Sequence, residues 1–255
     1  MKFNYQRVAI LAAFVIFCAG LSAFGQVPIT LTGVNGSYSA QDLCSSGAGC
    51  EQVYTGIYYA TVNNVANTGI ICDDFNHNVT TGETWNAAAI NTSALTANTT
   101  TGAISGVQFG AGVNGQTGAV VYAEVADLVS EIFSLNNGTG TFDGLTVTGT
   151  DLSEAIWDIT TNGHITGLSS TAAALVKCVE GIFGSDSTQA AISYLNSLNL
   201  WILTPSPDNG PQEMWTANMS VPEGGAAFLY LLLAALFCSW ALFVRNRERA
   251  GMPSH

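Results

Sequence analysis

The segment TGIICDDFNH, residues 68–77, gathers the side chains best suited to chemistry. Cys72 and His77 could form a thiol–imidazole pair for nucleophilic attack. The adjacent carboxylates of Asp73 and Asp74 could serve acid–base catalysis, but neighbouring side chains on a strand point to opposite faces. Catalysis needs a converging set of groups, and the sequence has no GxSxG, HExxH or glycine-rich phosphate loop. We therefore expect no enzyme, with a secreted hydrolase as the weakest alternative.

The same segment is also rich in hard oxygen ligands, which calcium prefers. These oxygens belong to Asp73, Asp74, Asn76 and Asn78. The Asp-x-Asp-x-Asp-Gly loop of the common calcium-binding motif is missing, so solvated acids at the end of a strand are the alternative interpretation. The sequence predicts no cofactor.

Charge is distributed unevenly along the chain. Residues 26–225 contain 17 acidic residues and one basic residue, Lys177, which gives a net charge of −16. This field repels nucleic acid and anionic lipid, so both are excluded as partners. The remaining polar residues are mainly Thr, Asn, Ser and Gly, a composition typical of β-rich secreted bacterial surface proteins rather than of highly charged disordered chains.

The first 25 residues have the features of a secretory signal peptide. Lys2 and Arg7 precede an apolar run over residues 8–21, and small residues stand just before Gln26. This pattern predicts export with cleavage after Gly25, and an uncleaved N-terminal anchor is the alternative.

Export changes the interpretation of the cysteines, because an oxidising compartment favours disulfides. Four cysteines fall in the exported part, namely Cys44, Cys50, Cys72 and Cys178. The first two flank a short flexible loop that could close, which would leave Cys72 to pair with Cys178. Three pairings are open from the sequence alone. A zinc site is disfavoured because no CxxC spacing and no histidine cluster accompany these cysteines.

Strand-like and helix-like patterns divide the body. Apolar and β-branched runs separated by Gly and Asn predict strands from residue 27 to about residue 90, followed by an exposed loop to residue 101. Strands are expected again over residues 200–205 and 213–221, and a turn-rich hairpin or loop over residues 135–149.

Helices are expected in the centre of the body, over residues 118–133, 151–160, 170–183 and 187–198. In the first, Val121, Val125, Leu128 and Ile132 form one stripe, with Glu124, Asp127 and Glu131 turned mostly away. The second is expected to begin after Thr150 or Asp151, and the fourth at a capping box of Asp186 and Gln189.

The predicted fold class is α+β: a β-rich ectodomain with strands at both ends of the sequence enclosing a helical centre, an N-terminal signal helix and a C-terminal transmembrane helix. The domains expected are a signal peptide at 1–25, an ectodomain at 26–219, a tail signal at 220–249 and a short cytoplasmic end at 250–255.

The tail SVPEGGAAFLYLLLAALFCSWALFVRNRER combines a short motif, an apolar run and a basic cluster. Residues 226–244 carry no charge and are long enough to span a bilayer as one helix. The cluster of Arg245, Arg247 and Arg249 would remain cytoplasmic and leave the body outside. A permanent membrane anchor is one interpretation of this segment.

The order of these parts resembles a PEP-CTERM-type protein-sorting signal, in which Pro-Glu-Pro precedes a helix and an arginine-rich end. The matching motif here is Val221, Pro222, Glu223, Gly224 and Gly225, with Gly224 in place of the second proline. The resemblance covers residues 220–249 only. It implies recognition by an exosortase, a membrane-embedded cysteine protease or transpeptidase of Gram-negative bacteria, which would remove the tail of an inner-membrane precursor.

The body is similar in motif order to a group of exported PEP-CTERM proteins, through YTGIYYATV, IICDDFNH, ETW, EAIWDI and ILTP. It also resembles thioester domains of bacterial adhesins, in which a cysteine is crosslinked to a glutamine. In this alignment Cys72 matches the cysteine, and Ser153 stands where the glutamine would be. Serine has no carboxamide to displace, so we expect no thioester and a structural role for Cys72.

Together these features predict a non-catalytic exported protein of the cell surface or extracellular matrix, structural or adhesive in role and connected with exopolysaccharide or biofilm. The alternative is a permanently anchored surface module that binds a ligand or calcium.

Overall fold

The computed structural model describes residues 26–34, 42–47, 49–136, 138–161, 163–206 and 211–219. The predicted signal peptide at 1–25, the VPEGG motif at 221–225, the apolar run at 226–244 and the arginine cluster all lie outside the described residues.

Six antiparallel strands form a closed barrel in the order β1-β4-β5-β10-β9-β6, in which β6 also pairs with β1. The strands are β1 (Gln26–Val34), β4 (Tyr58–Val62), β5 (Val65–Cys72), β6 (Thr84–Asn91), β9 (Trp201–Pro205) and β10 (Met214–Thr216). Strands β4 and β5 are joined by Asn63 and Asn64, both at positive φ, which suits a two-residue hairpin turn. Buried residues alternate along β1 and β4, as a sheet with one face in the core requires.

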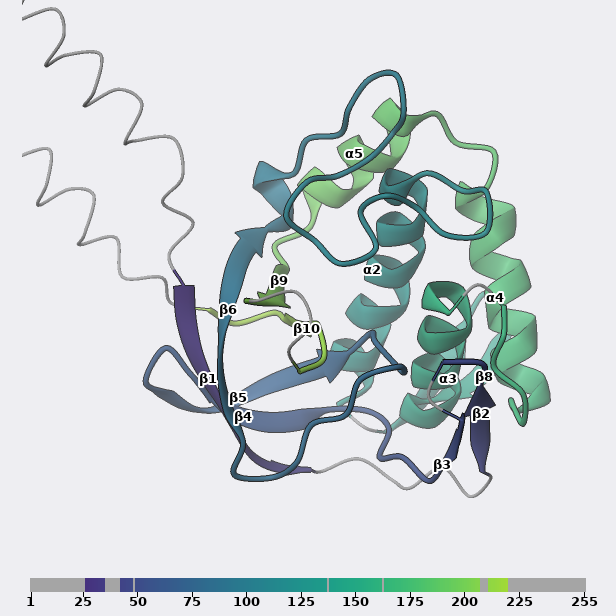
Figure 1. The fold of residues 1–255 in the computed structure, drawn as a ribbon. Helices are drawn as coiled ribbons and strands as arrows, with labels where there is room; N and C mark the ends of the chain where they lie inside the picture. The colour runs from purple at the N-terminus through teal and green to yellow at the C-terminus, as the bar shows by residue number, and fades with distance from the viewer. Residues whose placement is uncertain are drawn as a thin grey trace, which may run out of the picture. The chain divides into compact units, whose positions relative to one another are not determined.

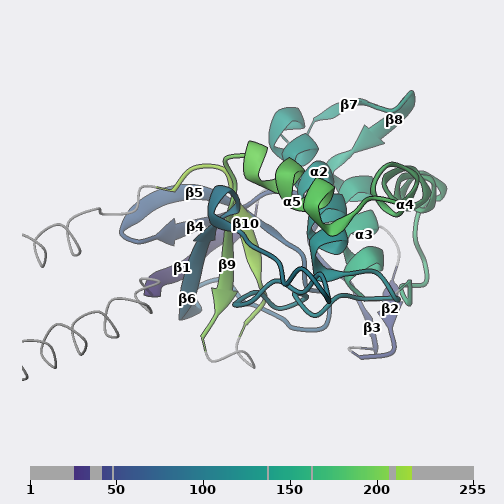
Figure 2. The same cartoon turned by 90° about the horizontal axis from the view of Figure 1, so that it is seen from above.

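Four helices and a one-turn 3-10 helix follow β6 in the sequence and precede β9. They are η1 (Thr92–Ala94), α2 (Gly118–Leu135), α3 (Gly149–Thr160), α4 (Ser170–Phe183) and α5 (Thr188–Ser197). Figures 1 and 2 both show the helices packed beside the barrel. Helix α2 is the central one, since α3, α4 and α5 all contact it.

Two small hairpins complete the fold. Strands β2 (Leu43–Ser45) and β3 (Gly49–Glu51) form one, and β7 (Thr139–Phe142) and β8 (Leu145–Thr148) form the other. The second turns at Asp143 and Gly144, again both at positive φ, and projects beyond the helices in Figure 2.

The predicted fold class is wrong in its arrangement. The strands from the two ends of the sequence do not enclose the helices; they close on one another, and the helices lie outside the barrel. None of the described helices is long and apolar enough to cross a membrane, and the predicted transmembrane segment at 226–244 lies outside the described residues. The longest, α2, contains Glu124, Asp127 and Glu131.

Helix starts differ in detail from their predictions. Helix α3 is capped by Thr148, whose side chain and that of Asp151 form a reciprocal capping box, rather than by Thr150 or Asp151. Helix α5 is capped by Ser187, which accepts a hydrogen bond from the Ala190 amide, so the predicted box of Asp186 and Gln189 is wrong. In both helices the capping acceptor is the hydroxyl of a nearby residue, Thr148 or Ser187, rather than the predicted side chain.

The loop between η1 and α2 is unusually long, with no helix or strand over residues 95–117. It is nevertheless tightly folded on itself. A Cβ on Gly110 would lie 1.9 Å from the Ile104 carbonyl oxygen, and one on Gly118 would lie 2.0 Å from the Gly110 carbonyl oxygen. These backbone contacts require glycine, and they fix the loop against the start of α2.

Candidate functional site: a buried acidic cluster at the end of β5

The segment TGIICDDFNH lies where β5 ends, and both of its carboxylates are buried. Asp73 is 0% exposed and Asp74 is 1% exposed. A third carboxylate, Glu213, is 0% exposed and precedes β10, the strand paired with β5. The backbone amide of Asp73 donates to the Glu213 carbonyl over 3.4 Å. Sequence reasoning missed Glu213, since a single acid before a short strand carries no local signal.

Glu213 is the hydrogen-bond acceptor at the centre of this cluster. The hydroxyls of Tyr122 and Thr204 donate to its two carboxylate oxygens. The backbone amide of Gln108 donates to Oε2 over 2.9 Å. Glu213 thereby joins α2, the long loop and β9 to the strand that closes the barrel.

The carboxyl of Asp73 lies beside that of Glu213, and its Oδ2 accepts the indole N–H of Trp215 over 2.6 Å. Its Oδ1 accepts no hydrogen bond from any described group. Burial raises the pKa of both carboxyls, and the charge of Glu213 raises the pKa of Asp73 further, whereas the donors around Glu213 act in the opposite direction. We therefore place the shared proton on Asp73 and the negative charge on Glu213.

Asp74 faces a different set of donors. Its Oδ2 accepts from His77 Nδ1 over 2.5 Å and from Gln108 Nε2 over 2.5 Å, and its Oδ1 accepts the Asn76 amide over 3.0 Å. The side chain of His77 is 40% exposed, so this pair connects the buried cluster to the surface. Asp73 and Asp74 thus serve separate partners, as expected for adjacent residues at a strand end.

Cys72 is buried, and its Sγ lies 3.3 Å from both the backbone nitrogen and the carbonyl oxygen of Asp74. Burial and then the neighbouring Asp74 and Asp73 raise the pKa of this thiol well above its usual range, which disfavours the thiolate needed for attack. His77 is bound to Asp74 instead. Cys72 and His77, considered above as a conceivable nucleophile pair, thus bind different groups of Asp74.

The disulfide prediction is half confirmed. Cys44 and Cys50 lie opposite each other in the β2–β3 hairpin and form a disulfide. The Cys72–Cys178 bond, one of the pairings that the sequence left open, does not form, because both are free thiols. Cys178 lies on α4, where its Sγ is 3.1 Å from Asp143 Oδ2, whereas Cys72 is enclosed at the end of β5. Pairing by elimination failed because an even number of cysteines does not require that all of them pair.

Cysteine mapping tests this assignment. Alkylation of the folded protein is expected to modify Cys178, which is half-buried, well before Cys72, which is enclosed. Peptide mass spectrometry after unfolding without reductant should find Cys44 joined to Cys50, with Cys72 and Cys178 both alkylated. A peptide linking Cys72 to Cys178 would contradict the structure.

The side chains of Asp73, Asp74 and Asn76, considered above as calcium ligands, are hydrogen-bonded to protein groups. Asn76 Oδ1 accepts the Ser45 hydroxyl over 2.8 Å, Asp73 faces Trp215 and Glu213, and Asp74 faces His77 and Gln108. In the described ranges, no group of three or more His, Cys, Asp or Glu side chains could hold a metal ion.

The two positions aligned with a thioester are also engaged elsewhere. Ser153 on α3 accepts the Gly56 amide over 2.9 Å, whereas Cys72 is bound to the Asp74 backbone. The expectation that no thioester forms rests on the chemistry of serine, and these contacts give each residue a packing role.

A fourth buried acid, Glu124, lies in the middle of α2 and is 0% exposed. The prediction that it turns away from the core is wrong, since α2 is covered by three other helices. Its Oε1 accepts Gln116 Nε2 over 2.7 Å, but its Oε2 has no partner among the described residues. Burial, together with the charge of Glu180, raises its pKa to about 7.

Comparisons with protein-family models, with curated proteins and with solved structures gave no match for this chain. The function is therefore argued from the residues themselves. The buried acids accept hydrogen bonds from several elements of the fold, an arrangement suited to holding the barrel and the helices together.

Proposed function

We propose that this chain is a non-catalytic exported protein of the bacterial surface or extracellular matrix, with a structural or adhesive role connected with exopolysaccharide or biofilm. The observation that carries the proposal is the order of elements at the tail. VPEGG, residues 221–225, precedes an uncharged run and three arginines, in a chain with one other basic residue after residue 25. An exosortase-type enzyme is the proposed partner, and an inner-membrane precursor released to or attached at the outer surface is the proposed route.

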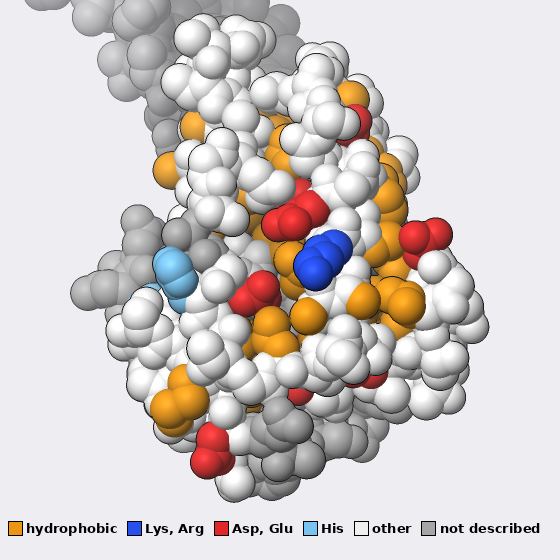
Figure 3. Space-filling view, turned by 90° about the vertical axis from the view of Figure 1, so that its right-hand side faces the viewer, with side chains coloured by type: hydrophobic (Ala, Val, Ile, Leu, Met, Phe, Trp, Pro, Cys, Tyr) orange, Lys and Arg blue, Asp and Glu red, His pale blue; other side chains and the backbone are white. Residues whose placement is uncertain are grey.

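Two features of the body support this proposal. The disulfide of Cys44 and Cys50 suits an oxidising compartment outside the cytoplasm. The exterior is strongly acidic, and Figure 3 shows a basic side chain with acidic side chains around it. Such a surface keeps a protein soluble and repels anionic polymers.

The test is fractionation of the native host together with intact-mass analysis of the mature protein. The double variant Pro222→Ala, Glu223→Ala is expected to stay in the membrane fraction at the mass of the unprocessed tail. Wild type and the neighbouring control Ser220→Ala should reach the surface or medium without residues 226–255. Identical fractionation of all three with the tail retained would refute sorting and favour a permanently attached surface module.

A further inference from the structure

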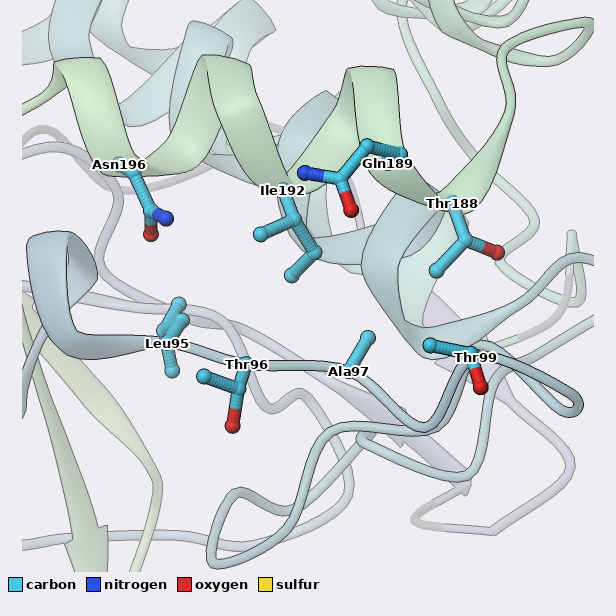
Figure 4. A pocket seen from close by; sticks show the side chains of 8 residues that line it. All are labelled: Leu95, Thr96, Ala97, Thr99, Thr188, Gln189, Ile192 and Asn196. Atoms are coloured by element: carbon cyan, nitrogen blue, oxygen red, sulfur yellow. The ribbon is translucent and has the colours of Figure 1, made fainter.

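A hollow of about 370 Å³ lies between the long loop and α5. Figure 4 shows the hydroxyls of Thr96, Thr99 and Thr188 turned away from the gap, so the lining singles out no class of ligand. The first residue of the barrel, in contrast, carries two groups that can react with each other once the signal peptide is removed.

Strand β1 begins at Gln26, the residue that directly follows the predicted cleavage site. The side chain of Gln26 is exposed, whereas Val27 is 4% exposed and pairs with Ala87 of β6. No linker separates the cleavage site from the core. Cleavage after Gly25 would therefore leave a free α-amine on the first residue of a barrel strand.

The register of β1 leaves the main-chain nitrogen of Gln26 outside the ladder with β6. Pro28 has no N–H to donate, so its pair with β6 is not hydrogen-bonded, and its carbonyl accepts the Asn63 amide on the β4 side over 2.9 Å. Alternation along an antiparallel strand then makes Val27 the hydrogen-bonded residue and turns the main chain of Gln26 away from β6. The described pairing of β1 with β4 begins only at Ile29.

The side chain of Gln26 reaches across the barrel surface. Its Nε2 donates to the hydroxyl of Ser206, which directly follows β9, over 2.9 Å. A single exposed hydrogen bond between neutral groups contributes little net free energy, so the side chain can leave this contact. Its amide carbon then reaches the α-amine of the same residue in a five-membered ring, a geometry that strongly favours intramolecular attack.

We propose that Gln26 is the N-terminal residue of the mature chain and cyclises to pyroglutamate, and that its contact with Ser206 slows the reaction. The α-nitrogen attacks the side-chain carbonyl carbon, the N–Cδ bond forms and the Cδ–Nε2 bond breaks. The proton lost by the amine leaves with Nε2 as ammonia, and no oxidant or co-substrate is consumed. The inference rests on the proposed export for the cleavage that frees the amine, whereas ring closure depends on the folded body.

The lactam has a consequence for the barrel. An aminopeptidase needs a free α-amine, and removal of only two residues would take Val27 out of the core and shorten β1. The ring removes that amine. It closes on the side of residue 26 that faces away from β6, so the ladder between β1 and β6 stays intact.

Edman sequencing and N-terminal peptide mass spectrometry of the mature chain from its host test the proposal. Wild type is expected to be blocked, with a first peptide that is lighter by one ammonia than the linear peptide beginning at Gln26. Gln26→Asn is the matched control, because it keeps an amide but would need a four-membered ring. This variant is expected to have a free amine and to lose residue 26 to an added aminopeptidase that leaves wild type unchanged.

A second measurement follows ring closure without the host. The chain from residue 26 onward is released from a removable N-terminal fusion partner, and loss of the free amine is timed by mass spectrometry. Ser206→Ala is expected to close about two- to tenfold faster than wild type, because the side-chain amide loses its acceptor. Thr141→Ala, at an exposed position on the β7–β8 hairpin, is the control and should close at the wild-type rate.

A wild-type amine that persists over several days, or a Ser206→Ala variant that closes no faster than wild type, overturns the proposal. In the host, a free amine at Gln26 overturns ring closure alone, whereas a chain that keeps residues 1–25 overturns it together with cleavage during export. Both measurements concern the N-terminus. Their failure therefore leaves the tail-sorting experiment unaffected, and failure of sorting leaves them valid.

Discussion

Replacing Glu213 with Gln is expected to destabilise the protein far more than replacing Asp73 with Asn, although the two acids share one proton. The new amide at position 213 would turn its N–H₂ group towards either Tyr122 or Thr204, each of which donates to one of the two carboxylate oxygens in wild type. Loss of a buried charged acceptor with several donors costs about 3–5 kcal/mol. An Asn at position 73 can instead accept from Trp215 and donate to Glu213, as the protonated acid does. Its cost should stay within about 1 kcal/mol near pH 6.

Urea unfolding of both variants over pH 5 to 8 measures this asymmetry. The pKa of Asp73 is raised in the folded state, so the stability from its bound proton is fully present below its unfolded pKa and is lost as pH rises through the folded value. The Asp73→Asn variant has no proton to lose at this position. Its free energy of unfolding, compared with that of wild type, should therefore increase with pH. Equal destabilisation by the two substitutions would show that the proton is not held by Asp73.

Glu124→Gln is expected to stabilise the protein at alkaline pH. The pKa of Glu124 is about 7 in the fold and 4.5 ordinarily, so wild type is fully stabilised below about pH 4.5 and loses stability as pH rises through 7. This pKa shift corresponds to a loss of about 3 kcal/mol in the folding stability of wild type by pH 8. The substituted amide can still accept from Gln116, and no charge then faces Glu180 on α4. Its N–H₂ group has no acceptor, which offsets the gain by about 1 kcal/mol.

The expected net result is a gain of about 2 kcal/mol at pH 8 and a small loss at pH 4.5. Chemical unfolding at both pH values measures it. Ser130→Ala, at a half-buried position later in the same helix that does not titrate, is the control and should leave the pH dependence as in wild type. A constant difference between Glu124→Gln and wild type across this range would show that Glu124 titrates normally.

The local elements were largely predictable because they depend on local pattern. The strands at β6, β9 and β10, the β7–β8 hairpin and the helix at α2 follow alternation, turn residues and helical periodicity. Closure of the barrel was not predictable, since it depends on β1 meeting β6 and β5 meeting β10, pairings that no local pattern specifies. The predicted fold class failed for this reason.

The candidate site was predicted in part. The segment from Cys72 to His77 was identified from its residue types, and its burial and partners were not. Glu124 was assigned to the surface because periodicity places polar residues outward, but this rule fails for a helix covered on several sides. Glu213 can be identified as a site residue only once β10 is paired with β5, because its hydrogen-bond partners come from distant parts of the sequence.

The position of β10 at the end of the body has a consequence for the order of folding. Asp73 and Trp215 are hydrogen-bonded although 142 residues separate them, and β10 lies between β5 and β9 in the barrel. A chain emerging from its N-terminus, at a ribosome or through a secretion channel, therefore presents β5 with one unpaired edge until the last strand has appeared. The barrel can be completed only after emergence of the whole body. Over that interval the open edge is available to chaperones and is vulnerable to aggregation.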